Sequence, residues 1–449
     1  MKTAFLLLIL ATIAPLLGAG NPAGDLRNNV ESLWQQNSTA RERAASSVKK
    51  YLRGPLTVAG AVQVALLNNR HLQQTFEEIG IAKADVIEAV TLPNPSVDFE
   101  VQFPVAASEL NRYGWLVAQE FAQILMIPLK KKISEERLEA AELRVAAEVL
   151  DLVADVKEAY FRVQADQQLL GRLKIIQKTN AASLDLAQKQ FEAGNVTDLD
   201  MLQMQSGYSQ GRMDIARAET GLNTRREELN RLLGLWGTQT EWEIRGDLLP
   251  APKSDFSLDH LESMAVSHRL DLRAAYRDLT SLVSALGLTR IYRWVPVLDF
   301  GFGGERDIDG ALNMGPSFRL EVPIFNQGQA RIARGEADLR RSEARFEALA
   351  VDIRSEVRQY RNQLVSLQDQ AEFYRREVLP RRIQAVNHSL LQYNAMQISP
   401  YALFQAKADE LASERGYIDA LRDYWIARAR LEGTVGGTLT QSRGRQSRR

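Results

Sequence analysis

The chain has 449 residues, among them no cysteine and only four histidines, and it carries no net charge. Without cysteine it has no disulfides, no thiolate zinc site, no iron–sulfur cluster, no cysteine nucleophile and no cysteine-linked lipid. The histidines lie far apart in the sequence, which argues against a clustered imidazole metal site. Because 56 basic residues balance 56 acidic ones, the charge indicates no nucleic-acid partner. We therefore expect no metal site, no cofactor and no nucleic acid.

The charge is unevenly distributed along the chain. Residues 1–20 contain one charged residue, Lys2, followed by an apolar stretch and small residues, a pattern that predicts a signal peptide and export. Gly20 stands where a lipoprotein signal would have cysteine, so we expect no acyl anchor. Residues 438–449 form a basic tail, and the chain between the two ends has a slight acidic excess.

Long apolar runs are missing after residue 20. A membrane helix needs ~20 apolar residues, whereas the best candidate, Phe121 to Leu129, is short and contains Pro128. The mature chain is therefore either soluble or crosses a membrane as strands, because alternating strands leave little signal in average hydropathy.

The chain contains two copies of one unit. Pro95-x-x-Asp98-Phe99 recurs 201 residues later as Pro296-x-x-Asp299-Phe300, and fixed internal offsets of this kind indicate duplication. We predict a segment at 21–55, a first repeat at 56–250 and a second repeat at 251–437. In each repeat, two strands (about 97–122 and 297–323) precede long helices (about 130–233 and 331–431).

The predicted strands alternate between apolar and polar residues. Along 97–103 every second residue is apolar and the others are polar or acidic, which places the two kinds on opposite faces of a strand. The apolar faces would lie on lipid or on a protein core, and lipid is favoured because the helices are already engaged elsewhere.

The predicted helices are unusually long. Apolar residues recur every seven positions from Leu138 through Val145 and Leu152, which indicates a coiled-coil seam. The first long helix turns at Ala193-Gly194-Asn195, and the second is interrupted at Pro380 before its partner begins near Pro400. The fold class is therefore mainly α with a small β part.

Three motifs resemble a known family: Leu92-Pro93-Asn94-Pro95, Phe191-Glu192-Ala193-Gly194 and the stretch Tyr417 to Trp425 near the end of the last helix. Together with the duplication they resemble the TolC-type outer-membrane channel subunits of efflux and type I secretion systems, and the last motif is similar to the heavy-metal branch. The resemblance implies a homotrimer in the outer membrane that extends into the periplasm. Its strands would form one twelve-stranded β-barrel, continued by a long periplasmic α-helical barrel. The implied partners are a periplasmic adaptor (membrane fusion) protein, an inner-membrane pump and outer-membrane lipid.

The resemblance also assigns roles to residues. The adaptor would contact the helix tips, formed by Gly194, Asn195, Val196, Thr197, Met396 and Gln397. The gate candidates are Asp200 and Tyr393, joined by a charge-assisted hydrogen bond; the alternative is an exposed aspartate and a seam tyrosine. The second tip departs from the family pattern at Met396, Ile398 and Ala402, which predicts a weaker or differently built gate. The residues expected to face the water-filled lumen are Asp98, Glu100, Glu120, Asp299 and Glu321.

Other functions fit the sequence less well. No phosphate loop, nucleophile elbow or zinc-ligand spacing occurs in a usable context, so we do not expect an enzyme. The rival to a channel is a periplasmic coiled-coil scaffold or adaptor without a pore. Met201 and Met204 are expected to be seam residues rather than copper ligands. The substrate, metal ions or small toxic compounds, rests on the last-helix motif alone.

Overall fold

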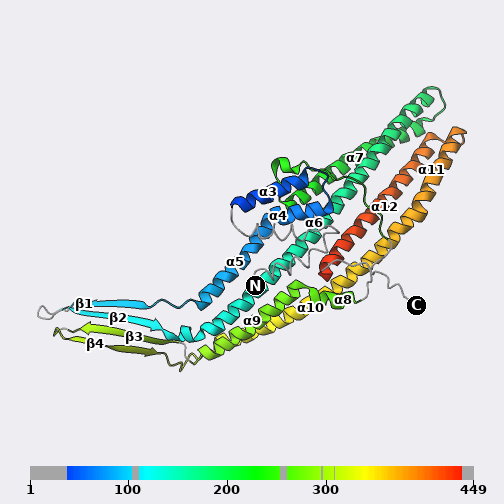
Figure 1. The fold of residues 1–449 in the computed structure, drawn as a ribbon. Coiled ribbons are helices and arrows are strands. Elements are labelled where there is room, and N and C mark those ends of the chain that lie inside the picture. The colour runs from blue at the N-terminus through cyan, green and yellow to red at the C-terminus, as the bar shows by residue number, and fades with distance from the viewer. Residues whose placement is uncertain (1–37, 104–110, 253–259, 295–296, 308, 437–449) are drawn as a thin grey trace, which may run out of the picture. The chain divides into compact units, whose positions relative to one another are not determined.

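The computed structural model describes residues 38–103, 111–252, 260–294, 297–307 and 309–436, most of which are helical (Figure 1). The predicted signal peptide and basic tail lie outside the described residues. The predicted segment 21–55 is described from Ser38 on, where it forms helix α3 (Ser38–Leu52). Among the described helices, none has an apolar stretch long enough to cross a membrane.

The elements follow one another in the same order twice. The first series is α4 (Val58–Asn68), α5 (Arg70–Val90), β1 (Ser96–Gln102), β2 (Arg112–Glu120), α6 (Phe121–Glu192) and α7 (Asp198–Leu233). The second is α8 (Leu261–His268), α9 (Leu270–Tyr292), β3 (Leu298–Arg306), β4 (Leu312–Leu320), α10 (Gln329–Phe373), α11 (Leu379–Asn394) and α12 (Pro400–Val435). Two short helical segments also occur: η2 (Gly237–Thr240) lies between α7 and α8, and η3 (Tyr374–Val378) lies between α10 and α11. The predicted fold class, mainly α with strands in a duplicated unit, is confirmed.

Two compact units cut across the two series of elements. The sheet unit contains the described residues of Thr75–Ala147 and Leu270–Val351. The helical unit contains the described residues up to Gln74, those of Glu148–Arg269 and those from Asp352 on. Each unit therefore takes elements from both repeats, as expected if the repeats fold together rather than as separate domains.

The four strands form one antiparallel sheet in the order β1-β2-β3-β4. Phe99 lies opposite Trp115, and Phe300 lies opposite Phe318, so that one face of the sheet is apolar. Phe99 is 80% exposed and Phe318 is 65% exposed. The alternation predicted from the sequence is thus present, and a single chain leaves the apolar face uncovered.

The first long helix begins earlier than the sequence predicts. We expected it to start at Lys130, after Pro128, but α6 begins at Phe121, directly after β2, and includes the proline. Pro128 lacks the N–H that would bond the carbonyl of Ile124, a defect that costs ~3 kcal/mol in a helix interior. The remaining turns of a 72-residue helix and its packing outweigh that local cost.

The predicted interruption at Pro380 takes the form of a π-helix. The segment η3 (Tyr374–Val378) lies just before the proline and inserts a wide turn into an otherwise continuous helix. Such bulges accommodate residues that cannot join the regular ladder of hydrogen bonds. The Tyr374 ring lies over Gly416 of α12, where a Cβ would be 2.6 Å from its hydroxyl. Gly416 therefore makes room for the widened turn.

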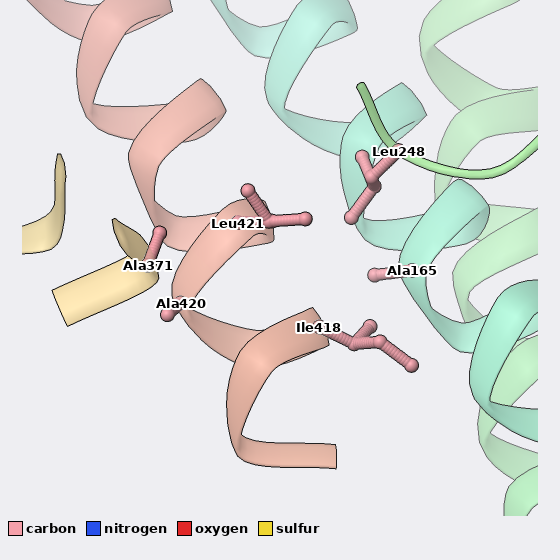
Figure 2. Close-up of a cluster of buried hydrophobic side chains, with 6 residues drawn as sticks. All are labelled: Ala165, Leu248, Ala371, Ile418, Ala420 and Leu421. Atoms are coloured by element: carbon pink, nitrogen blue, oxygen red, sulfur yellow. The ribbon is translucent and has the colours of Figure 1, made fainter. Parts of the chain in front are cut away.

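The link between the two repeats crosses the helical unit as an extended segment, called here the strap, which includes Ile244, Leu248 and Leu249. Gln167 of α6 donates to the carbonyl of Ile244, and Trp425 of α12 donates to that of Leu249. Figure 2 shows the strap residue Leu248 packed in a buried cluster with one residue of α6, one of α10 and three of α12: Ala165, Ala371, Ile418, Ala420 and Leu421. The motif that resembles the heavy-metal branch therefore supplies much of this core, which explains its residues by packing.

Candidate functional site: the helix tips and the polar face of the sheet

A tight turn joins α6 to α7 at the first tip. The N–H of Gly194 donates to the carbonyl of Phe191 (2.9 Å), and that of Asn195 donates to the carbonyl of Gln190 (2.8 Å). Gly194 has a φ of 77°, the left-handed conformation that this Schellman ending requires and that glycine adopts without strain.

The second tip has the same hydrogen-bond pattern without the glycine. The N–H of Met396 donates to the carbonyl of Tyr393, and that of Gln397 donates to the carbonyl of Gln392, both at 2.9 Å. Met396 has a φ of 58° and is 95% exposed. A residue with a Cβ pays ~1–2 kcal/mol for this conformation, and no burial of the Met396 side chain compensates for the cost.

The helix that follows each tip is capped by a hydroxyl. The Thr197 side chain accepts a hydrogen bond from the N–H of Asp200 (3.1 Å) and donates one to its carboxylate (2.9 Å). Ser399 accepts a hydrogen bond from the N–H of Ala402 (3.3 Å). The two caps therefore match, except that the second tip has no carboxylate at the position of Asp200.

The two gate candidates take different partners within this chain. The Asp200 carboxylate accepts from Thr197 (2.9 Å), whereas the Tyr393 hydroxyl donates to the amide oxygen of Gln190 in α6 (3.2 Å). The predicted Asp200–Tyr393 hydrogen bond is absent from the described residues because the helix cap already engages the carboxylate. Helices α6 and α7 form the first helical hairpin, and helices α11 and α12 form the second. Tyr393 still joins α11 to α6, so the two hairpins are in contact near the tips.

A second contact between the hairpins was not predicted. The ring of Phe404 in α12 lies directly over Gly207 of α7, and a Cβ on that glycine would be 2.5 Å from Cζ of the ring. Only glycine lets the aromatic ring approach so closely. The sequence signal, a glycine inside a long helix, was available but its partner was not.

Met201 and Met204 lie in the seam beside the first tip, as predicted. They are 5% and 2% exposed and pack with Ala187, and Tyr401 of α12 covers the cluster. Their sulfur atoms are thus part of a hydrophobic core. Among the described residues, no three His, Asp or Glu side chains lie close enough to hold a metal ion.

The predicted lumen acids lie on the polar face of the sheet, with one exception. Asp98 and Glu100 alternate with the apolar residues of β1, and Glu120 of β2 lies opposite Asp299 of β3. Glu321 follows the end of β4 and lies outside the strand. Four of the five acids therefore lie on one face of the sheet. That this face lines a lumen stays a prediction.

Other residues of the polar face were missed. Arg319 pairs with Asp299 at 3.6 Å, and Arg112 of β2 pairs with Glu305 of β3. Strand β3 continues to Arg306, so the same period of two that places Asp299 on this face also places Glu305 there.

A hollow of about 840 Å³ in the helical unit also carries charged groups. Asp166 of α6 lies in it, with arginines from α7 and α12, Arg225 and Arg422, also lining it. Burial raises the pKa of the Asp166 carboxyl, although both arginines act to lower it. This group was not predicted, because the sequence does not reveal that three distant helices surround it.

Relatives of the chain are efflux proteins. Residues 61–235 match the family described as outer membrane efflux protein. The cobalt-zinc-cadmium resistance protein CzcC of Cupriavidus metallidurans is 21% identical over 394 residues, which are 85% of this chain and 90% of that protein. The toluene efflux pump outer membrane protein TtgI of Pseudomonas putida is 25% identical over 250 residues, 53% of this chain and 49% of that protein. Residues 61–235 thus resemble the outer membrane efflux protein family, in agreement with the resemblance predicted from the sequence.

Solved structures share the fold of this chain. CusC superposes with a TM-score of 0.70 at 19% identity and covers 85% of this chain and 92% of its own. A membrane protein from Pseudomonas aeruginosa superposes with a TM-score of 0.74 at 18% identity, covering 84% and 92%. The predicted resemblance is thereby confirmed, and so is the predicted location in the outer membrane with an extension into the periplasm. The family comprises transport proteins rather than a class of enzymes.

Proposed function

We propose that this efflux channel protein works as a homotrimer and is the outer-membrane subunit of a tripartite efflux system. Its passage would be a passive exit duct across the periplasm and the outer membrane, opened when a periplasmic adaptor protein docks at the helix tips. An inner-membrane pump would supply the substrate. The observation that carries the proposal is the amphipathic four-stranded sheet joined to two helical hairpins with matching tips.

The edges of the sheet support the homotrimer. Strands β1 and β4 each have one neighbour, so each presents a row of unpaired backbone groups on its outer side. A closed barrel needs ~8 strands or more, whereas the described part of one chain contributes four. Three copies would supply twelve strands and leave no edge, with the polar face inside and the apolar face toward lipid.

The geometry of the tips supports their role in docking. Met396 is exposed and strained, and strained residues persist where function selects them. Gly194, Asn195, Val196 and Thr197 would form the first-tip contact, and Met396 with Gln397 the second. The gate would depend on contacts between the hairpins, those of Tyr393 with Gln190 and of Phe404 with Gly207, rather than on Asp200 within one chain.

For the substrate we propose metal cations before small toxic compounds. CzcC, whose match spans most of both chains, is named for cobalt, zinc and cadmium resistance, whereas TtgI is named for toluene. The polar face of the sheet has more acids than arginines, which favours the passage of cations.

Single-channel recording in planar bilayers tests the proposed function. The purified full chain should produce discrete conductance steps. In fractionated cells the chain should be recovered with the outer membrane. A chain that produces no conductance and is recovered from the soluble periplasm would support the scaffold or adaptor alternative instead. Growth of a deletion strain in cobalt, zinc and cadmium salts, compared with growth in toluene, would decide between the two substrate classes.

A further inference from the structure

Three segments that border the sheet are rich in positive charge. Residues 121–134 follow β2, residues 286–297 precede β3 and residues 322–335 follow β4; together they contain seven cations and no acid. The whole chain, by contrast, has equal numbers of each. These cations, called here the basic belt, are Lys130, Lys131, Lys132, Arg290, Arg293, Arg331 and Arg334. The segment before β1 differs, since it contains Asp85 and Glu88.

Part of the basic belt is neutralised by acids that lie farther from the sheet. The pairs are Lys131 with Glu135 at 3.7 Å, Arg290 with Glu336 at 2.9 Å and Arg334 with Asp338 at 4.0 Å. In each pair a side chain that borders the sheet meets an acid on the helical side. The positive charge therefore remains concentrated toward the strands.

The other members of the basic belt have no acidic partner among the described residues. Lys132 and Arg331 are exposed, and Lys130 bonds only the amide oxygen of Gln123 (3.3 Å). Arg293 donates to the amide oxygen of Gln327 (3.5 Å), and its Nε is buried. Three cations per chain, Lys130, Lys132 and Arg331, are thus available to an anion from outside the chain.

Exposed apolar side chains lie between the basic belt and the strands. Trp294 is 64% exposed, Ile324 is 68% exposed and Phe325 is 91% exposed. The guanidinium of Arg293 lies 4.6 Å from the centre of the Trp294 ring. Exposed tryptophan beside arginine is the combination that sits at a membrane–water interface, because the ring is apolar at one end and polar at the other.

We propose that the basic belt binds the phosphate groups of anionic phospholipids in the inner leaflet of the outer membrane. This inference rests on the proposed function, in which the sheet crosses the membrane. Strand β3 has nine residues, the length of a tilted transmembrane strand (~9–11 residues). The residues just beyond the strand ends, Trp294 and Ile324 among them, therefore lie in the headgroup layer. Lys132 and Arg331 lie on helices farther toward the periplasm. Because side chains in a helix lean toward its N-terminus, these two long side chains reach back toward that layer.

Charge favours lipid over a second copy of the chain as the occupant. Every copy brings the same cations, so two basic belts in contact would repel each other. Phosphate headgroups bring the opposite charge and accept hydrogen bonds from lysine and arginine. Each cation beside an anionic surface changes binding about fivefold, and two unpaired ones together about 25-fold.

Native mass spectrometry of the full-length protein in detergent tests the proposal, with cardiolipin as the anionic probe and phosphatidylethanolamine as the zwitterionic one. The variant Lys132→Gln/Arg331→Gln removes two unpaired, exposed cations. The matched control Arg340→Gln/Arg345→Gln removes two exposed cations of α10 that lie farther along the helix from the sheet. Planar-bilayer conductance of the same preparations reports the proposed function separately.

We expect the wild type and the control to bind cardiolipin more tightly than phosphatidylethanolamine, and the belt variant to bind it about 25-fold more weakly with unchanged conductance. Equal binding by all three proteins, or no preference for cardiolipin, would overturn the proposal while the channel function stands. A belt variant that changes the number of chains per complex but not lipid binding would show that a second copy occupies the surface. Lipid binding without conductance would refute the function instead.

Discussion

Gly207→Ala is the substitution that tests the contact between the two hairpins most sharply. The added Cβ would lie 2.5 Å from Cζ and 2.6 Å from Cε1 of Phe404, whereas carbon atoms in contact prefer about 3.5–4.0 Å. The ring, or the helix that carries it, must retreat by about 1 Å. Overpacking of this kind costs ~1–3 kcal/mol, and the cost falls on the arrangement in which α7 and α12 touch.

The magnitude translates into gating if this contact holds the channel closed. A cost of ~1–3 kcal/mol corresponds to about a 5- to 150-fold shift of the closed–open equilibrium. We therefore expect Gly207→Ala to raise the open fraction in single-channel recordings by about fivefold or more. Gly221→Ala on the same helix is the matched control, because nothing lies within 4 Å of its Cβ. Both substitutions favour the helix by up to ~1 kcal/mol, so their difference isolates the overpacking.

The Phe404→Ala background tests the cause. The three atoms nearest to the new Cβ all belong to the Phe404 ring, so in the absence of that ring Gly207→Ala should have no further effect on the open fraction. The reasoning would be refuted if Gly207→Ala behaved like Gly221→Ala, or if its effect persisted in the absence of the Phe404 ring.

Three further predictions concern stability, measured by unfolding of the purified protein in detergent. Met396→Gly relieves the left-handed strain at an exposed position and should raise the free energy of unfolding by about 1 kcal/mol; a decrease would show that Met396 makes a stabilising contact. Burial raises the pKa of Asp166, so its stabilising contribution is present in acid and lost as pH rises through the folded pKa. Asp166→Asn should therefore raise the melting temperature at pH 7 but not in acid below the pKa of a fully solvated aspartate carboxyl, and equal shifts at both pH values would contradict this. The Tyr160 hydroxyl donates to the carbonyl of Leu56 (2.9 Å), and burial raises its pKa to about 12. Tyr160→Phe should cost ~1–2 kcal/mol and should abolish the part of the stability loss that this group causes between pH 10 and pH 12; an unchanged alkaline profile would count against the assignment.

Periodicity in the sequence revealed the parts of the fold that depend on local pattern. The alternation in 97–103 predicts which residues share a face, because side chains of a strand alternate strictly. The duplication predicts the order of the elements, and Gly194 marks the first tip because a left-handed helix ending selects glycine. Each of these inferences needs only neighbouring residues or a fixed offset.

The features that the sequence did not reveal depend on packing between distant segments. The start of α6 was misplaced because Pro128 breaks a helix locally, while tertiary contacts keep it intact. Met396 adopts the glycine conformation because the second tip repeats the backbone of the first. The partners of Asp200 and Asp166 follow from a helix cap and from the meeting of three helices, and neither can be read from spacing alone.

The central claim is that three chains close one channel through β1 and β4, and disulfide cross-linking measures this directly. Because the chain has no cysteine, Glu100→Cys in β1 can be combined in turn with Asn313→Cys, Gly315→Cys or Ser317→Cys in β4. Within one chain these strands are three spacings apart, about 14 Å, too far for a disulfide, whose Cα atoms lie within ~7 Å.

Oxidation in membranes should therefore cross-link only different chains. We expect at least one pair to yield a covalent species of three chains on a denaturing gel, and no larger species. A ladder that continues beyond three chains, or monomers from every pair, would contradict it.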